Sequence, residues 1–241
     1  MSLRFLTLCL LLPLLTTCNG QKKQAAQPDS SVYTTGVASP NGTGKFYLGR
    51  EISYVMGHLA ADWLERPERE REENVSQAIA NLNIRPGEDI ADIGAGSGYY
   101  TFRMAELAPE GKVYAVDIQP EMLALMDEKI RTEGIENVEL VQGSEFSPQL
   151  AENSVDLVIM VDVYHELAYP REMMENIVSA LRPAGRFVLL EYRTEDPEVP
   201  IKRLHKMSER QAVREMDAVG LRLRENIGNL PWQHCMVFVK K

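Results

Sequence analysis

The chain has 241 residues, a net charge of −9 at pH 7 and 44% hydrophobic residues. This length suits one sizeable α/β domain with a short appendage, and the acidic balance argues against nucleic acid as a partner. Cys9, Cys18 and Cys235 are too few and too badly placed for a disulfide framework or a zinc site.

The N-terminus has the pattern of a signal peptide. Arg4 precedes a mostly apolar run at 5–15, which is shorter than the roughly 20 residues that span a bilayer. The run ends in Leu-Thr-Thr-Cys at 15–18, which resembles a bacterial lipoprotein processing box in which the Cys is lipidated. We therefore expect 1–18 to be a signal peptide and the protein to be exported to the bacterial cell envelope, in the periplasm or anchored through a lipid on Cys18. Cleavage after Gly20 without a lipid is the alternative.

Residues 19–44 are polar and rich in Pro, Gly, Ser and Thr, which predicts a flexible linker before a folded domain at 45–241. Apolar residues at helical spacing predict a helix at 51–64, and Pro67 suits the first turn of a second helix that runs to about 82. Acids and bases alternate over 65–73. A solvated face is the first interpretation of this run, and a lid whose charges reach a ligand is the alternative.

From residue 88 the pattern alternates between strands and helices. Strands are predicted at 89–93, 112–116, 138–141, 155–161 and 186–191, with helices at 100–108, 120–132 and 170–181. A helix at 208–219 and two strands at 221–227 and 235–240 follow. Repeated strand–helix units predict a doubly wound, mostly parallel sheet that binds ligands at the carboxyl ends of its strands. The last two strands have no helix between them and predict an antiparallel hairpin at the sheet edge.

A glycine-rich turn follows the first of these parallel strands. The sequence Asp-Ile-Gly-Ala-Gly-Ser-Gly at 92–98 places small residues where a strand turns into a helix, so a ligand can approach backbone N–H groups. The dinucleotide fingerprint needs a small residue where Tyr99 stands. Asp117 follows the second strand, where a carboxylate can accept hydrogen bonds from both ribose hydroxyls. Capping of the helix that starts at Pro120 is the alternative role for Asp117.

This turn, with an acid two residues before its first glycine, resembles the first motif of class I S-adenosylmethionine-dependent methyltransferases. The likeness extends over about 46–240, and segments such as Val-Asp-Val-Tyr-His-Glu-Leu at 161–167 are similar to a subgroup of exported bacterial methyltransferases. The resemblance implies an α/β, Rossmann-like fold with a seven-stranded sheet, a C-terminal antiparallel hairpin and an N-terminal helical lid. It also implies S-adenosylmethionine as cofactor.

The resemblance assigns roles to residues at the carboxyl ends of the strands. The expected cofactor-binding residues are Asp92, Gly94, Ala95, Gly96, Gly98, Asp117, Ile118, Glu145 and Asp162, with Ser144 an equal candidate to Glu145. The loop after the fourth strand would face the transferable methyl group, so Tyr164, His165 and Glu166 are the expected catalytic residues, with His165 the natural base near neutral pH. A helix-entry role is the alternative for His165. Asp162, His165 and Glu166 lack further spaced ligands, so no metal is expected.

The function that these features favour is methyl transfer to an unidentified, small-molecule acceptor. An exported protein that binds a nucleoside or another small ligand without catalysis is the alternative, because S-adenosylmethionine is made in the cytosol. An NAD-dependent oxidoreductase is disfavoured by Tyr99 and the short glycine spacing. The charged stretch at 200–207 is interpreted either as a grip for an anionic substrate or as a surface loop.

Overall fold

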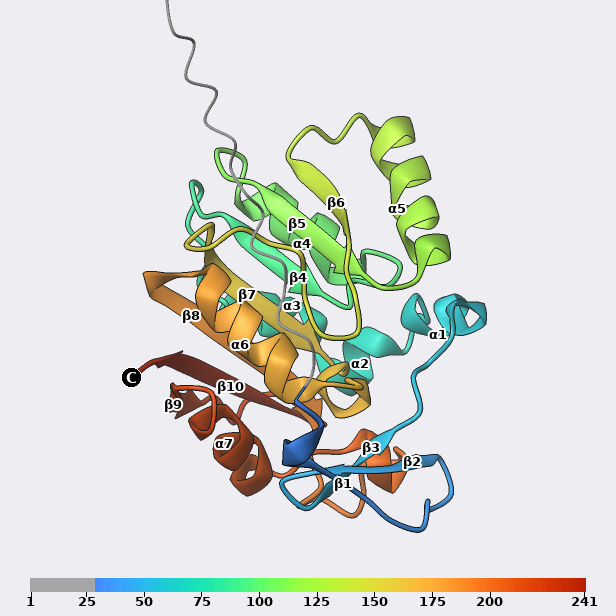
Figure 1. Cartoon of the computed structure of the whole chain (residues 1–241). Helices are drawn as coiled ribbons and strands as arrows, with labels where there is room; N and C mark the ends of the chain where they lie inside the picture. Colours follow the sequence, from blue (N-terminus) through green and yellow to red (C-terminus); the bar gives the residue numbers. More distant parts are fainter. Residues whose placement is uncertain (1–28) are drawn as a thin grey trace, which may run out of the picture.

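The computed structural model describes residues 29–241 and is built around one seven-stranded sheet (Figure 1). Its strands are β4 (Ile90–Ile93), β5 (Val113–Asp117), β6 (Val138–Gln142), β7 (Val155–Val161), β8 (Leu181–Tyr192), β9 (Leu221–Asn226) and β10 (Gln233–Lys240). Their order across the sheet is β6-β5-β4-β7-β8-β10-β9. The first five run parallel, and β10 is antiparallel to both β8 and β9. The predicted Rossmann-like sheet with a C-terminal antiparallel hairpin is confirmed.

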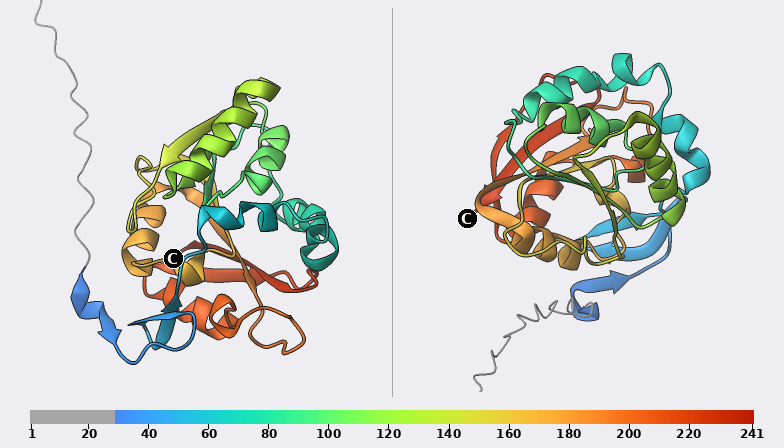
Figure 2. Two further views of the ribbon diagram at one scale, coloured as in Figure 1. Left: turned by 90° about the vertical axis from the view of Figure 1, so that its right-hand side faces the viewer. Right: turned by 90° about the horizontal axis from the view of Figure 1, so that it is seen from above.

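Helices cover both faces of the sheet (Figure 2). They are α3 (Val75–Asn81), α4 (Tyr99–Leu107), α5 (Pro120–Glu133), α6 (Pro170–Ala180) and α7 (Glu209–Asp217). Buried side chains of α6 and α7 form one hydrophobic core with the sheet, and those of α3 and α4 form another. α5 packs beside α4 through Met126, next to Phe102. The sheet is thus buried on both faces, as a parallel sheet requires.

The N-terminal part of the described chain differs from the prediction. In place of a linker up to residue 44 and a helix at 51–64, β1 (Tyr33–Thr35), β2 (Gly42–Tyr47) and β3 (Arg50–Ser53) form a small antiparallel sheet. A 3₁₀ turn, η1 (Ser30–Val32), precedes β1. Only η2 (His58–Ala60) and α1 (Ala61–Leu64) are helical in the second range.

Long-range contacts fix this small sheet. The backbone N–H of Asp29 and the hydroxyl of Tyr33 both donate to the carboxylate of Glu172 on α6. Arg50 on β3 forms an ion pair with Glu215 on α7 at 2.7 Å. Polar composition therefore misled the linker prediction, because these partners lie more than a hundred residues away and local sequence does not show them.

The second N-terminal helix is interrupted. α2 (Arg69–Glu73) and α3 are separated by Asn74, whose left-handed φ of 52° ends one helix while its side chain accepts a hydrogen bond from Gln77 and caps the next. The charges on α2 are not all solvated, as the first interpretation required. Arg69 is 4% exposed and Glu73 is fully buried, and the two form an ion pair at 2.7 Å. The solvated-face interpretation therefore does not hold for these two residues.

The predicted signal peptide at 1–18, Cys18 and residues 19–28 of the predicted linker lie outside the described residues. Over residues 29–241, the helices are too short or too polar to cross a bilayer.

Glu88, which precedes β4, joins the start of this strand to β8. Its carboxylate accepts two hydrogen bonds of 2.8 Å from Arg186 and one of 2.9 Å from Nε of Arg85. Burial alone would raise the pKa of Glu88, but these bonds outweigh it and lower the pKa to about 2. Because the folded-state pKa lies below the unfolded one, the stabilisation is present above about pH 5 and is lost as the pH falls toward about 2.

We expect Glu88→Gln to lower the free energy of unfolding at pH 7 by about 1–3 kcal/mol, because it removes a buried charge from two arginines. Urea unfolding between pH 7 and pH 3 measures this, and the difference from wild type should shrink below about pH 4.5. The control is Glu139→Gln, whose partner Lys112 lies at the surface, and it should change stability by less than about 0.5 kcal/mol. A difference that does not vary with pH would contradict this role for Glu88.

Candidate functional site

A cavity of about 680 Å³ opens at the carboxyl ends of the parallel strands. The turns that follow β4, β5, β6 and β7 form its floor. Residues 54–64 of the N-terminal segment and the loop at 200–205 contribute further walls. This is the place where doubly wound sheets bind ligands, and the volume suits a small molecule of nucleotide size.

The glycine turn after β4 forms part of the floor. Gly94 and Gly96 line the cavity and have φ values of 72° and 57°. Residues with side chains rarely adopt this left-handed backbone conformation. A Cβ on Gly94 would lie 2.6 Å from Cγ2 of Val163, and one on Gly96 would lie 2.8 Å from Cδ1 of Leu64. The turn therefore leaves bare backbone at the cavity wall. Gly98 faces away, where a Cβ would meet the ring of Phe102.

Two other predicted contacts also lie outside the cavity lining. Asp92 is buried behind the turn, where its Oδ2 accepts a hydrogen bond of 2.7 Å from the Thr101 hydroxyl. Burial raises the pKa of Asp92 to about 6. Ala95 is buried against the core beside α4. Asp92, Ala95 and Gly98 therefore lie behind the cavity lining, where they support the turn.

Asp117 ends β5 and lines the cavity. Its Oδ2 accepts a hydrogen bond of 2.9 Å from the Gly96 N–H, and its Oδ1 accepts one of the same length from the Gln119 N–H. Burial raises the pKa of this carboxyl. The two backbone bonds fix the carboxylate beside the glycine turn, and each oxygen keeps a lone pair for a ligand hydroxyl. Ile118, the next residue, is 43% exposed and also lines the cavity.

Both alternative cofactor contacts predicted in the loop after β6 lie at the cavity. Ser144 and Glu145 line the cavity together with Gly143, and neither is favoured over the other by the lining. The Ser144 hydroxyl is bonded within its own loop, at 3.1 Å from the Ser147 N–H.

Asp162, directly after β7, is the most unusual polar group of the site. It has a φ of 53° and is half-buried, with Oδ2 accepting a hydrogen bond of 2.6 Å from the Gln233 amide. Burial, followed by the nearby charges of Glu73 and Glu191, raises its pKa well above the ordinary value. Within the described residues, Oδ1 has no hydrogen-bond partner. A buried acceptor left without a donor at a cavity wall is suited to an ammonium or N–H group of a ligand.

The three residues expected to be catalytic lie on one 3₁₀ turn, η3 (Tyr164–Glu166), but only two line the cavity. Tyr164 is fully buried and its hydroxyl donates to Glu215 at 2.8 Å, so it supports the fold and has no direct access to a ligand. His165 and Glu166 do line the cavity.

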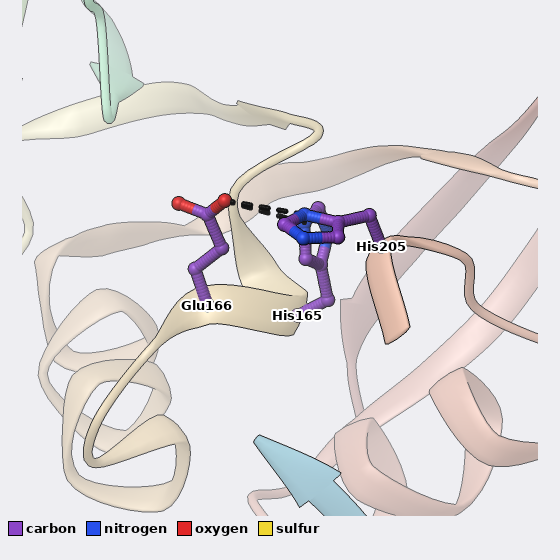
Figure 3. A group of neighbouring side chains, drawn as sticks. All are labelled: His165, Glu166 and His205. Carbon is purple, nitrogen blue, oxygen red and sulfur yellow. Dashed lines mark hydrogen bonds and ion pairs between the residues drawn. The ribbon is translucent and has the colours of Figure 1, made fainter. Parts of the chain in front are cut away.

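His165 and Glu166 meet a third side chain, His205 on η4 (Arg203–His205), as Figure 3 shows. Nδ1 of His165 is 2.7 Å from Oε2 of Glu191, and Nε2 of His165 is 3.0 Å from Nδ1 of His205. Oε1 of Glu166 lies 3.6 Å from Nε2 of His165 and 3.4 Å from Nδ1 of His205. The other oxygen of Glu166 accepts a hydrogen bond of 3.0 Å from the Met56 N–H.

This arrangement changes the role expected of His165. Burial alone would lower the pKa of His165, but the charge of Glu191 and hydrogen bonds to Glu166 and Glu191 outweigh it and raise the pKa to about 10. Burial would raise the pKa of Glu166, but its bonds to His165 and His205 lower it to about 2. These carboxylates therefore favour the protonated form of the His165 ring, which suits the expected role of a base less well.

Several cavity residues were not among the predicted site residues. They include Met56, Trp63, Leu64, Arg69, Gln119, Tyr192 and His205. Most come from segments with no ligand motif of their own, but Arg69 belongs to the charge run at 65–73, and His205 and Lys202 belong to the charged stretch at 200–207. Lys202 also lines the cavity, which fits the binding interpretation of that stretch better than the surface-loop one.

Comparisons with known proteins identify the family of this chain. Residues 84–232 match the family model described as a methyltransferase domain. The chain is 33% identical to an arsenite methyltransferase of Halobacterium salinarum over 107 residues, which are 44% of the chain. It is 28% identical to a demethylmenaquinone methyltransferase of Geobacillus stearothermophilus over 114 residues, which are 47% of the chain. These matches span 27% and 49% of the two relatives, so the chain covers at most about half of their length.

The fold is shared with a solved structure of a SAM-dependent methyltransferase from Aquifex aeolicus. The TM-score is 0.70 at 22% identity, and the likeness covers 77% of this chain and all of that one. The family model spans more than half of the chain and includes β4 to β9 with the glycine turn, Asp117 and Asp162. The chain belongs to the methyltransferase domain family.

Proposed function

We propose that this protein is an S-adenosylmethionine-dependent methyltransferase that acts on a small-molecule acceptor. The observation that supports this best is the cavity itself, in which bare glycine backbone, a fixed carboxylate and an unpartnered carboxylate oxygen lie along the carboxyl ends of neighbouring strands. These three features correspond to three chemically different parts of one ligand.

The fit of S-adenosylmethionine is argued group by group. Asp117 would accept hydrogen bonds from the ribose hydroxyls, because its oxygens are held at the cavity wall by two backbone N–H groups. The unpartnered Oδ1 of Asp162 suits the α-ammonium group of the methionine part. The backbone at Gly94 and Gly96 would lie against the ligand between these two points. Ser144 or Glu145 would contact the adenine from the loop after β6.

When bound, S-adenosylmethionine supplies a methyl group on a positively charged sulfur, so the protein has mainly to orient the acceptor. His165 and Glu166 occupy the cavity wall beyond Asp162 and are the residues that we propose hold the acceptor. His165 is fixed through Glu191, and Glu166 through the Met56 N–H, so both present their remaining polar atoms in set directions. Neither group has a pKa near neutral, where a general base works best.

The acceptor that we propose is small and partly apolar. Trp63, Leu64, Val55 and Ile201 supply apolar surface to the cavity, and Val55 and Trp63 are 56% and 39% exposed. The net charge of −9 makes nucleic acid a poor partner. Arsenite and demethylmenaquinone appear in the names of two curated relatives, and neither is a protein or a nucleic acid.

The glycine turn gives the sharpest test of cofactor binding. Gly96→Ala should weaken S-adenosylmethionine binding at least tenfold, about 1.4 kcal/mol, because the new methyl group enters the cavity wall. Isothermal titration calorimetry with S-adenosylmethionine and S-adenosylhomocysteine measures this.

Gly134→Ala is the matched control. Gly134 ends α5 with a φ of 65°, close to the 57° of Gly96, and nothing lies within 4 Å of its added Cβ. Both variants should therefore lose about 1 kcal/mol of stability from backbone strain, but only the first should lose affinity. Absence of saturable binding in the wild type contradicts the proposal. Binding of a nucleoside in preference to the cofactor supports a non-catalytic binding protein in its place.

For the location, we propose export to the bacterial cell envelope, as in the subgroup of exported methyltransferases that the sequence resembles. The support is the sequence at 1–18, with its basic residue, short apolar run and Cys18. A lipid on Cys18 would be the protein's contact with a membrane.

Mass spectrometry of the mature protein, made in a bacterial host and fractionated, tests the location. The expected result is a chain that begins at Cys18 with the added mass of a diacylglycerol group, found in the membrane fraction. A chain that begins at Gln21 in the periplasm supports export and rejects the lipid. An unprocessed N-terminus on a cytosolic protein contradicts both.

A further inference from the structure

The side chains of His165, Glu166 and His205 are held together in a way that the cofactor does not explain. They come from two turns, η3 and η4, and the two histidines are 40 residues apart along the chain. One ligand atom from each residue lies within 4.8 Å of the others, and all three side chains line the cavity (Figure 3). We propose that they bind one divalent transition-metal ion, through Nε2 of His165, Oε1 of Glu166 and Nδ1 of His205.

The distances between these atoms suit a common metal. Two ligand atoms about 2.1 Å from an ion and about 90–110° apart lie roughly 3.0–3.4 Å from each other. The distance between the imidazole nitrogens is 3.0 Å, and Oε1 of Glu166 is 3.4 Å and 3.6 Å from them. Small side-chain rotations therefore place an ion within bonding distance of all three.

The groups behind the ligands are those that metal sites use. Nδ1 of His165 bonds to Oε2 of Glu191 at 2.7 Å, a carboxylate–histidine pair that fixes the ring and directs Nε2 outward. The second oxygen of Glu166 is held by the Met56 N–H at 3.0 Å. Arg50 donates a hydrogen bond of 3.2 Å to the carbonyl of His165, which fixes η3 itself. The ligand atoms are thus oriented before any ion arrives.

The donor set selects the class of ion. Two imidazoles and one carboxylate on one face favour divalent first-row transition metals over Mg²⁺ and Ca²⁺, which prefer all-oxygen sites. The side chains of His165, Glu166 and His205 are 2%, 11% and 23% exposed, so the site is open on the side of His205 and the cavity. Three protein ligands leave coordination positions for a molecule in the cavity.

The proposed function gives this ion a role, and this part of the inference rests on the proposed function. An acceptor hydroxyl that binds the ion releases its proton to solvent more readily. The acceptor oxygen then forms a bond to the methyl carbon, while the bond between that carbon and sulfur breaks and its electron pair stays on sulfur. The acceptor class that fits is a small molecule with a hydroxyl group able to bind a metal.

The site is tested by measuring metal binding to the full chain. The protein is made without a histidine tag, and bound metal is first removed with a chelator. Titration calorimetry with Zn²⁺ should show one ion per chain, and Co²⁺ should give the visible absorption of a nitrogen- and oxygen-ligated ion. His205→Ala and Glu166→Gln should each weaken binding at least tenfold. Mg²⁺ should not bind at the same concentrations.

The chain offers matched controls, because it has only four histidines. His234 also forms a histidine–glutamate pair, with Glu195 at 3.0 Å, and His58 lies 4.0 Å from Glu121, but neither belongs to the cluster. His234→Gln and His58→Ala should leave Zn²⁺ affinity unchanged. Acetohydroxamate, a small ligand with two oxygen donors, should change the Co²⁺ spectrum if coordination positions are open to the cavity.

Several results would overturn the site. The first is a folded wild type that binds no stoichiometric Zn²⁺ or Co²⁺. The second is a metal affinity in both His205→Ala and Glu166→Gln that equals that of the wild type. The third is a Co²⁺ spectrum with thiolate bands, which would place the ion on a cysteine. The Co²⁺ spectrum of the wild type decides the point even if a variant fails to fold. S-adenosylmethionine is titrated into the same samples, and a chain that binds Zn²⁺ but not the cofactor supports the metal site while contradicting the proposed function.

Discussion

The parallel arrangement of β4 to β8 is the constraint on which the whole site depends. Because parallel strands end at the same edge of the sheet, residues that follow different strands, such as Gly94, Asp117 and Asp162, come together at one cavity. Crossover helices on both faces bury the sheet and hold the strand ends in place. The bond from the Gly96 N–H to Asp117 then joins two neighbouring turns directly. The cavity floor is therefore tied directly to the sheet beneath it.

The other side of the cavity is built by segments outside the parallel strands. The Met56 N–H binds Glu166, and Gln119 bonds to the His58 N–H at 2.7 Å and to the Met56 carbonyl at 3.1 Å. β3 lies against η3 and η4, which carry the histidine cluster. The segment that follows β3 thus connects the cofactor side of the cavity to the side that we assign to the acceptor.

Buried charge distinguishes the two sides chemically. Asp162, desolvated and near the carboxylates of Glu73 and Glu191, has a raised pKa and an oxygen without a donor. Glu166 and His165 stabilise each other's charged forms, so the pKa of one is lowered and that of the other raised. An unpartnered acceptor suits a positively charged ligand group, whereas a compact set of nitrogen and oxygen donors suits a metal ion. The same cavity therefore offers two kinds of recognition at its two ends.

The sequence by itself determined the alternating sheet, the glycine turn and Asp117, because periodicity and local spacing encode them within a few residues. It did not determine β1 to β3, whose strands are fixed by Glu172 and Glu215 from helices far along the chain. It placed Tyr164 beside His165 in a catalytic group, but the side chains of neighbouring residues on η3 point to different surroundings. His205 joined His165 only through the tertiary structure, since no short motif spans 40 residues. Local pattern decides which elements form, and long-range packing decides which side chains meet.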